Sequence, residues 1–223
     1  MCGRYTLATD LEELIEVFEV PPTLFAHQPR YNIAPTQTAP VVAQDRKGRR
    51  MGLMRWGLIP YWAKDPAIGN RHINARSETV RERPAFRDAF SRRRCLVPAD
   101  GFYEWQRADG PRRPFWIHPV DGAPLSFAGL WERWRPPDGD DVFSFTILTT
   151  DASDPVRPVH DRMPAIIPPS EREVWLSRDS DPETLTALLG PYAEGLQARE
   201  VSTWVNRPDH DDPTCIEPTD EAG

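Results

Sequence analysis

Cys2 offers the most reactive pair of groups in the sequence. A small second residue permits removal of Met1, and we predict that Cys2 becomes the first residue of the mature chain. Its free α-amine, with a pKa of about 7.7–8.0, then stands on the carbon next to the one that carries a thiol of pKa about 8.5. An aldehyde can condense with the amine to a Schiff base, and the thiol can close on the imine to a five-membered thiazolidine. Because many chains begin with Met-Cys by chance, Cys2 alone does not establish this chemistry.

Three polar side chains could assist such a nucleophile. Asn74, in the polar run INARSET, carries an amide that both donates and accepts hydrogen bonds. Glu104 lies in the aromatic run FYEW, where strand alternation would place it on the face of Phe102 and desolvation would raise its pKa toward general acid–base use. His160, beside Asp161, can shuttle protons near pH 7. The alternatives are a solvated strand face for Glu104 and an exposed loop for His160.

The sequence lacks the common metal and nucleotide motifs. Its three cysteines, Cys2, Cys95 and Cys215, are far apart, and no CxxC or HExxH occurs. We therefore predict no metal site and no cofactor. The same odd and sparse cysteine count argues against a disulfide framework and for a reducing compartment.

Net charge is unevenly distributed along the 223 residues. The formal total is −7, but residues 1–135 carry a net +6 and residues 136–223 a net −13. The stretch 71–113 is the most basic, with 11 arginines against 6 acidic residues. Because local potential steers a ligand more than net charge does, an acidic total does not exclude a polyanionic partner.

The hydropathy of the sequence excludes a transmembrane helix. No apolar run approaches the roughly 20 residues that a spanning helix needs. The first residues, MCGRYTLATD, have no basic segment followed by an apolar one, as a signal peptide would. We therefore expect a cytoplasmic protein without a membrane partner.

The elements that must position these residues are mostly short strands. Turn residues, prolines and apolar periodicity predict one β-rich α+β domain with short flanking helices. The expected helices and helical turns are 10–18, 77–83, 84–90, 170–176 and 181–189, and the expected strands are 38–44, 49–56, 94–99, 101–107, 114–119, 124–134, 142–150 and 198–205, with a turn at 108–110. The acidic residues 209–223, poor in apolar side chains, are predicted to be a mobile tail.

Six motifs occur in order from Met1 to about Pro208. They are MCGRY at the start, RYNIAPTQ (30–37), RWGLIPYWAKD (55–65), NARSET (74–79), RCLVPADGFYEW (94–105) and VHDRMP (159–164). Together they resemble the SRAP (SOS-response-associated peptidase) family of abasic-site-processing proteins. The resemblance implies an SRAP domain over residues 1–208, with a barrel-like core and a positive cleft for single-stranded DNA.

The resemblance also implies a reaction. Cys2 would attack the ring-opened aldehyde of an abasic site in single-stranded DNA and form a stable thiazolidine cross-link that protects the lesion. Asn74 would position the N-terminal residue and the sugar. Glu104 would transfer protons during ring opening, Schiff-base formation and any strand-incising lyase reaction, and His160 would be the second proton-transfer group and assist reversal.

The DNA contacts follow from the same resemblance. Arg4, Arg76 and Arg162 match positions that contact the DNA backbone, and Trp62 lies in the loop that resembles the base-stacking wedge. We expect a monomer. Two other functions stay open at this point: a thiol peptidase or hydrolase of the N-terminal-nucleophile kind, and a non-catalytic module that binds single strands.

Overall fold

The computed structural model describes residues 2–106 and 112–219. Met1, the turn expected at 108–110 and the last four residues lie outside this range. The helices are α1 (Leu11–Val17), α2 (Arg87–Arg92), α3 (Arg172–Leu176) and α4 (Pro182–Ala187), with short 3₁₀ turns η1 (Pro66–Arg71), η2 (Pro169–Glu171), η3 (Thr203–Asn206) and η4 (Pro213–Ile216). The strands are β1 (Tyr5–Leu7), β2 (Arg30–Ile33), β3 (Thr38–Asp45), β4 (Gly48–Trp56), β5 (Asn74–Arg76), β6 (Arg94–Ala99), β7 (Gly101–Gln106), β8 (Arg113–Pro119), β9 (Leu125–Trp134), β10 (Val142–Asp151), β11 (Arg162–Pro164) and β12 (Leu196–Glu200).

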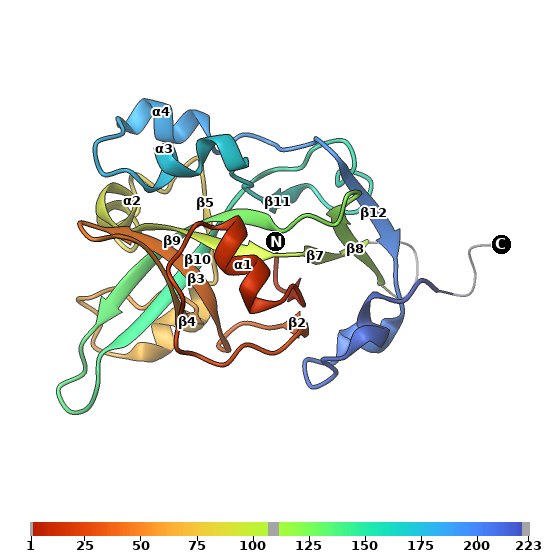
Figure 1. Ribbon diagram of the computed structural model, residues 1–223, viewed down its shortest axis with the longest axis horizontal. Helices are drawn as coiled ribbons and strands as arrows, with labels where there is room; N and C mark the ends of the chain where they lie inside the picture. Colours follow the sequence, from red (N-terminus) through yellow and green to blue (C-terminus); the bar gives the residue numbers. More distant parts are fainter. Residues whose placement is uncertain (1, 107–111, 220–223) are drawn as a thin grey trace.

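The strands form two sheets with short helices around them (Figure 1). One sheet has the order β12-β8-β7-β1-β2. The larger sheet has the order β11-β10-β4-β3-β6-β9. Because β9 also pairs with β10, the strands from β10 to β9 follow one another around a barrel-like core. The prediction of a single, β-rich α+β domain is confirmed. Among the described residues, no helix has the length and apolarity to cross a membrane.

Aromatic side chains from both sheets make the core. Tyr5 of β1 packs edge-on against Trp56 of β4, with ring centroids 5.2 Å apart, and against Phe127 of β9 at 6.0 Å. Phe102 of β7 also meets Phe127 edge-on. All four side chains are fully buried. Such edge-to-face contacts add to the stability gained from apolar burial, and they hold β1 and β7 firmly against the larger sheet.

The predicted and observed elements differ mainly where segments are very short. Each of β1, β5 and β11 has three residues, too few to show strand alternation; β1 and β5 pair with strands distant in sequence, and β11 pairs with the preceding strand β10. Residues 77–82 form hydrogen-bonded turns, as the expected short helical turn does, and the expected strand 198–205 ends at Glu200 and gives way to η3.

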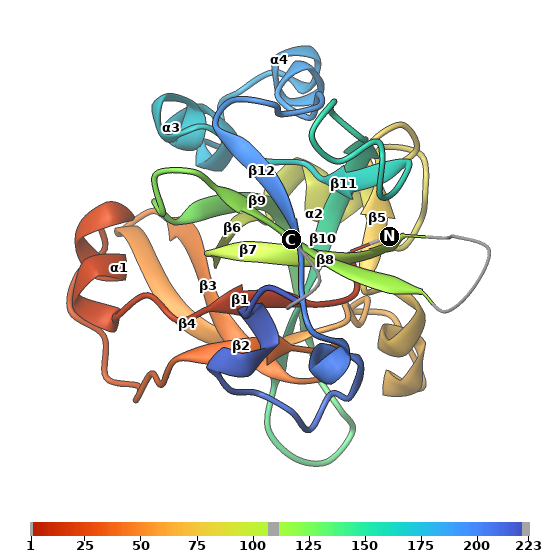
Figure 2. The same ribbon diagram turned by 90° about the vertical axis from the view of Figure 1, so that its right-hand side faces the viewer.

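The acidic C-terminal residues differ most from the prediction. Figure 2 shows the dark-blue segment with η3 and η4 lying against β2 rather than extending from the molecule. Cys215 in η4 is fully buried, and Asp211 accepts hydrogen bonds from the backbone N–H groups of Tyr31 (2.5 Å) and Asn32 (2.8 Å). Residues 209–219 are therefore a packed part of the fold, because this carboxylate satisfies edge N–H groups of the smaller sheet.

Candidate active site

Strand pairing brings residues from four distant motifs together. β1 pairs with β7, and the Tyr103 N–H donates to the Arg4 carbonyl oxygen at 3.0 Å, so the residues before β1 run beside Glu104. β5, which carries Asn74, pairs with β10, and so does β11, which follows His160. The structure thus places the four expected catalytic residues in one region.

Cys2 is held inside this region. Its residue is fully buried, its carbonyl oxygen accepts a hydrogen bond from the Asn74 Nδ2 amide (2.7 Å), and its Sγ lies 3.7 Å from the Arg4 carbonyl oxygen. Burial raises the pKa of the Cys2 thiol, and the nearby Glu104 carboxylate raises it further. The thiol therefore stays protonated at neutral pH.

The side-chain oxygen of Asn74, Oδ1, is buried and has no hydrogen-bond partner among the described residues. A buried amide oxygen without a hydrogen-bond donor destabilises the fold. Its position beside a reactive residue indicates that the donor is supplied by the mature N-terminus or by the substrate.

Glu104 is a buried carboxyl group. It follows Phe102 by two positions on β7, so both side chains lie on the inner face, and only 3% of Glu104 is exposed. Burial raises the pKa of Glu104 from its usual 4.5 to about 7. The carboxyl group can therefore donate or accept a proton near neutral pH.

His160 faces Glu104 from the turn before β11. Its Nε2 lies 3.9 Å from Glu104 Oε2. Its Nδ1 is 2.9 Å from two groups, the Arg162 backbone N–H, which donates to the neutral ring, and the Asp161 carboxylate, which would pair with the protonated ring. In the neutral tautomer that the Arg162 N–H selects, the ring proton is on Nε2 and points to Glu104.

An open cleft of about 610 Å³ adjoins the site. We call it the arginine groove; Trp62, Arg71, His72, Asn74, Arg76 and Arg83 are among the residues that line it. No carboxylate is among its described lining residues. Asn74 and Arg76 are two positions apart on β5, so one strand face carries a site residue and a cation. The groove suits a polyanion that passes the site.

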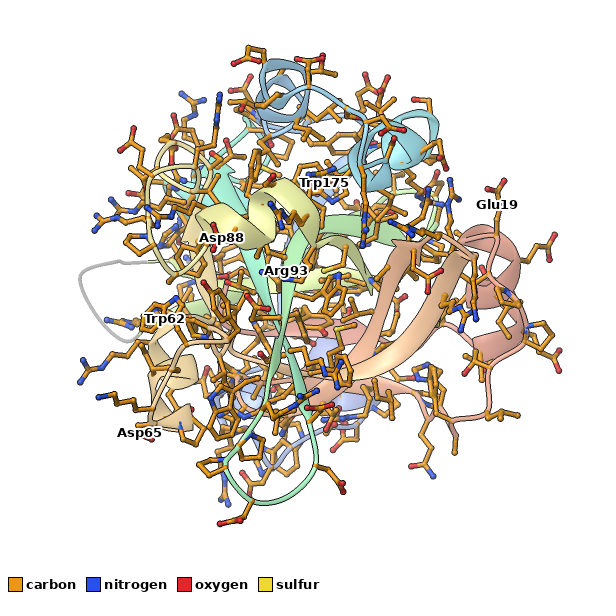
Figure 3. All side chains as sticks on the ribbon, turned by 90° about the vertical axis from the view of Figure 1, so that its left-hand side faces the viewer. Glu19, Trp62, Asp65, Asp88, Arg93 and Trp175 are labelled. Carbon is orange, nitrogen blue, oxygen red and sulfur yellow. The ribbon has the colours of Figure 1, made fainter. Side chains whose placement is uncertain are left out.

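The four residues expected to contact DNA have different surroundings. Trp62 is 48% exposed, and Figure 3 shows it at the surface on the loop that leads into η1. Arg76 is exposed in the arginine groove. Arg4 is half-buried, and its Nη1 donates to the side chain of Asn32 and to the Val205 carbonyl oxygen.

Arg162 is the most constrained of the four. Its guanidinium pairs with Glu78 and with Asp151 (2.7 Å) and donates to the Thr149 carbonyl oxygen (2.7 Å). Burial lowers the pKa of Arg162, but the two carboxylates raise it by more, so the net change is upward. Its charge is largely neutralised within the protein.

Sequence reasoning did not single out Arg71 and Arg83 of the arginine groove. Both lie in the basic stretch 71–113, so the local positive charge could have indicated a binding region for an anion. Only the fold shows which arginines of this stretch line the same cleft. Among the described residues, no group of three or more His, Cys, Asp or Glu side chains could hold a metal ion.

Comparisons with known proteins give one result. A family model described as SOS response associated peptidase (SRAP) matches residues 1–208. A Bacillus subtilis protein named abasic site processing protein YoqW is 41% identical over 222 residues, which cover 97% of this chain and 99% of its own. The chicken protein (Gallus gallus) named abasic site processing protein HMCES is 34% identical over 224 residues, with 86% and 67% covered.

A solved structure shares the fold. The crystal structure of a protein from Bacteroides thetaiotaomicron superposes with a TM-score of 0.90, covers 98% of this chain and 100% of its own, and is 24% identical. The fold is therefore common to distant sequences.

Proposed function

Since the chain belongs to the SOS response associated peptidase (SRAP) family, we propose that it captures abasic sites in single-stranded DNA as a covalent cross-link to Cys2. The observation that carries this proposal is the cluster of Cys2, Asn74, Glu104 and His160 beside a groove lined by arginines. Such a protein would shield the lesion during a DNA damage response.

The reaction begins after Met1 is removed. The α-amine of Cys2 adds to the aldehyde carbon of the ring-opened abasic sugar, and Glu104 in its protonated form gives the departing oxygen its proton, so that water leaves and an imine remains. The Cys2 sulfur then bonds to the imine carbon while its proton passes to the nitrogen through the Glu104 carboxylate. The product is a thiazolidine, and the net change is the loss of one water.

A pKa of about 7 suits Glu104 to both proton transfers, because each form of the group is well populated near neutral pH. His160, with Nε2 directed to Glu104, can replenish or remove the proton and so assist reversal. Elimination from the imine, which would cut the strand, competes with ring closure by the thiol.

Burial of the Cys2 thiol favours this reaction over a thiol peptidase or hydrolase. A hydrolase of that kind attacks with a thiolate, whereas burial keeps this thiol protonated. In the proposed reaction the amine attacks first, and the thiol acts only when it is already next to the imine.

A denaturing gel tests the proposal. Incubation with a single-stranded oligonucleotide that contains one abasic site should give a band of protein joined to DNA. The same oligonucleotide with a tetrahydrofuran residue, which cannot open to an aldehyde, should give none. Binding of both DNAs without any covalent band would instead support a non-catalytic single-strand-binding module.

Asn74→Ala should slow cross-linking about tenfold to a hundredfold, because the amide that holds the Cys2 carbonyl and offers Oδ1 to the new α-amine is lost. Single-turnover rates at saturating DNA measure the effect. Asn70→Ala, at an exposed asparagine of η1, is the control and should keep the wild-type rate. Equal rates for the two variants would contradict the positioning role of Asn74.

Glu78→Gln should tighten binding of single-stranded DNA about threefold at low salt, because Arg162 loses one carboxylate partner and gains freedom to pair with a phosphate. Fluorescence anisotropy at several salt concentrations measures affinity and its salt dependence. Glu82→Gln makes the same charge change at an exposed neighbour and should have a smaller effect. Weaker binding by Glu78→Gln would show that Arg162 needs this partner.

A further inference from the structure

The C-terminal residues pack against the smaller sheet and form hydrogen bonds with its edge strand β2. We call residues 203–219 the C-terminal clasp; it contains η3 and η4. In addition to its two hydrogen bonds from the N–H groups of Tyr31 and Asn32, Asp211 forms an ion pair with Arg30. One carboxylate thus satisfies two backbone donors and one cation on β2.

The clasp reaches the N-terminal strand through Asn32. This side chain is fully buried, and its Nδ2 lies within hydrogen-bond distance of three clasp carbonyl oxygens, those of Val205 (3.2 Å), Arg207 (2.9 Å) and His210 (2.7 Å). Its Oδ1 accepts a hydrogen bond from Arg4 Nη1 (3.0 Å), which also donates to the Val205 carbonyl oxygen (3.1 Å). Arg4 is two residues after Cys2, so the clasp fixes the chain next to the nucleophile.

The clasp also holds both neighbours of Glu104. The Trp105 indole N–H donates to Asn206 Oδ1 (2.7 Å). Tyr103 is fully buried in a small second core that includes Cys215. Because neighbouring residues on a strand point to opposite faces, anchoring Tyr103 and Trp105 on the outer face fixes Glu104 on the inner one.

We propose that the C-terminal clasp positions the reacting groups of the site and that Asp211 is its main positioning residue, acting through Asn32 and Arg4 on Cys2. This inference rests on the proposed function for its role in catalysis. Displacement of a reacting group by about 1 Å can cost a hundredfold in rate, so a clasp on both Cys2 and Glu104 is able to control cross-linking. Asp211 lies beyond the residues that the family model matches, so the family motifs do not include it.

Three variants of the full chain test the proposal. Asp211→Ala removes the carboxylate, Asp211→Asn keeps an oxygen that can accept the two N–H groups, and Asp209→Asn makes the same charge change at an exposed residue that pairs with Arg207. At saturating abasic DNA, and well below each unfolding midpoint, we expect the cross-linking rate constant to fall about tenfold in Asp211→Ala and less in Asp211→Asn.

The concentration of DNA at half-maximal rate should change less than twofold, since the arginine groove is untouched. Asp209→Asn should behave as the wild type. A rate constant for Asp211→Ala equal to that of Asp209→Asn would overturn the proposal. So would a loss that appears only in the fraction of active molecules or in the unfolding midpoint, since that is the signature of a purely structural role.

A second measurement does not require DNA. Alkylation of Cys2 by iodoacetamide, followed by mass spectrometry of its peptide, should be about tenfold faster in Asp211→Ala than in Asp209→Asn, because release of the strand exposes a buried thiol. Cys95, buried in the main core, should react equally slowly in both. Equal alkylation of Cys2 would overturn the clasp, whereas failure of the wild type to cross-link would instead contradict the proposed function.

Discussion

Replacement of Cys2 by alanine is expected to lower formation of the heat-stable DNA adduct at least about 1000-fold, because ring closure requires the thiol. The α-amine of the mature variant can still form an imine. We therefore expect borohydride, which reduces imines to stable amines, to trap an adduct of Cys2→Ala that is absent without the reductant. Denaturing gels run with and without borohydride measure both effects.

Cys95→Ala is the matched control. Cys95 is also a fully buried thiol, but it lies in the main core and its carbonyl oxygen accepts a hydrogen bond from the Trp175 indole. Because alanine keeps that carbonyl, this variant should cross-link at the wild-type rate. A heat-stable adduct of Cys2→Ala without reductant would show that another nucleophile performs the reaction.

The second large effect is expected from Glu104→Gln, which should slow cross-linking about 100-fold, because the amide cannot pass protons to the leaving oxygen and the imine nitrogen. Single-turnover rates across pH 5 to 9 measure it. The wild-type rate should respond to ionisation near the pKa of about 7, and this response should disappear in the variant.

The same substitution should stabilise the protein. A carboxyl group with a raised pKa lowers the free energy of unfolding when it is charged. For Glu104 this loss is absent below about pH 4.5, grows between about pH 4.5 and pH 7, and stays constant at higher pH. The full difference corresponds to about 3 kcal/mol, and we expect Glu104→Gln to recover about 2 kcal/mol of unfolding free energy at pH 8. Urea unfolding at pH 5 and pH 8 measures the change, which should be smaller at pH 5.

Glu132→Gln separates site chemistry from burial. Glu132 is another buried strand glutamate with a raised pKa, but it pairs with Arg93 (2.8 Å) and lies outside the site. Its variant should keep the cross-linking rate and lose stability, the opposite of Glu104→Gln, because breaking the pair leaves Arg93 without its partner. Loss of stability in Glu104→Gln would mean that the carboxylate is structural.

The sequence predicted the longer elements because their periodicity is local. Strands such as β6 and β9 were located to within a residue, since aromatic and β-branched runs bounded by turns indicate strands by themselves. The three-residue strands β1 and β5 could not be found in this way. Each exists because a distant strand supplies its hydrogen bonds, and that information lies in the tertiary fold.

The sequence predicted the residues of the candidate site but not the C-terminal segment that packs beside them. Residue chemistry and the resemblance indicated Cys2, Asn74, Glu104 and His160. Alternation with Phe102 favoured a buried Glu104 but left a solvated strand face open, and only the structure shows the carboxyl group buried. Residues 209–219, the later part of the C-terminal clasp, were expected to belong to a mobile tail, because composition alone gives an acidic, proline-containing segment no reason to pack. The Asp211 carboxylate finds two N–H donors and one cation on β2, which only the fold brings near.

The sequence showed where positive charge is concentrated, but the fold decides which arginines line the groove. The basic stretch 71–113 supplies Arg71, Arg76 and Arg83 to the arginine groove. Arg162, from the acidic part of the chain, is neutralised by Glu78 and Asp151. The positive groove on a protein of net charge −7 therefore arises because Arg71, Arg76 and Arg83 form no ion pair with the described residues, whereas Arg162 does.

The intact mass of the purified cross-link tests the central claim most directly. After incubation with an oligonucleotide that contains one abasic site, the product should have the mass of the chain without Met1 plus the oligonucleotide minus one water, and peptide mapping should place the DNA on residue 2. An adduct on a chain that retains Met1, or on any other residue, would contradict capture by the amine and thiol of Cys2.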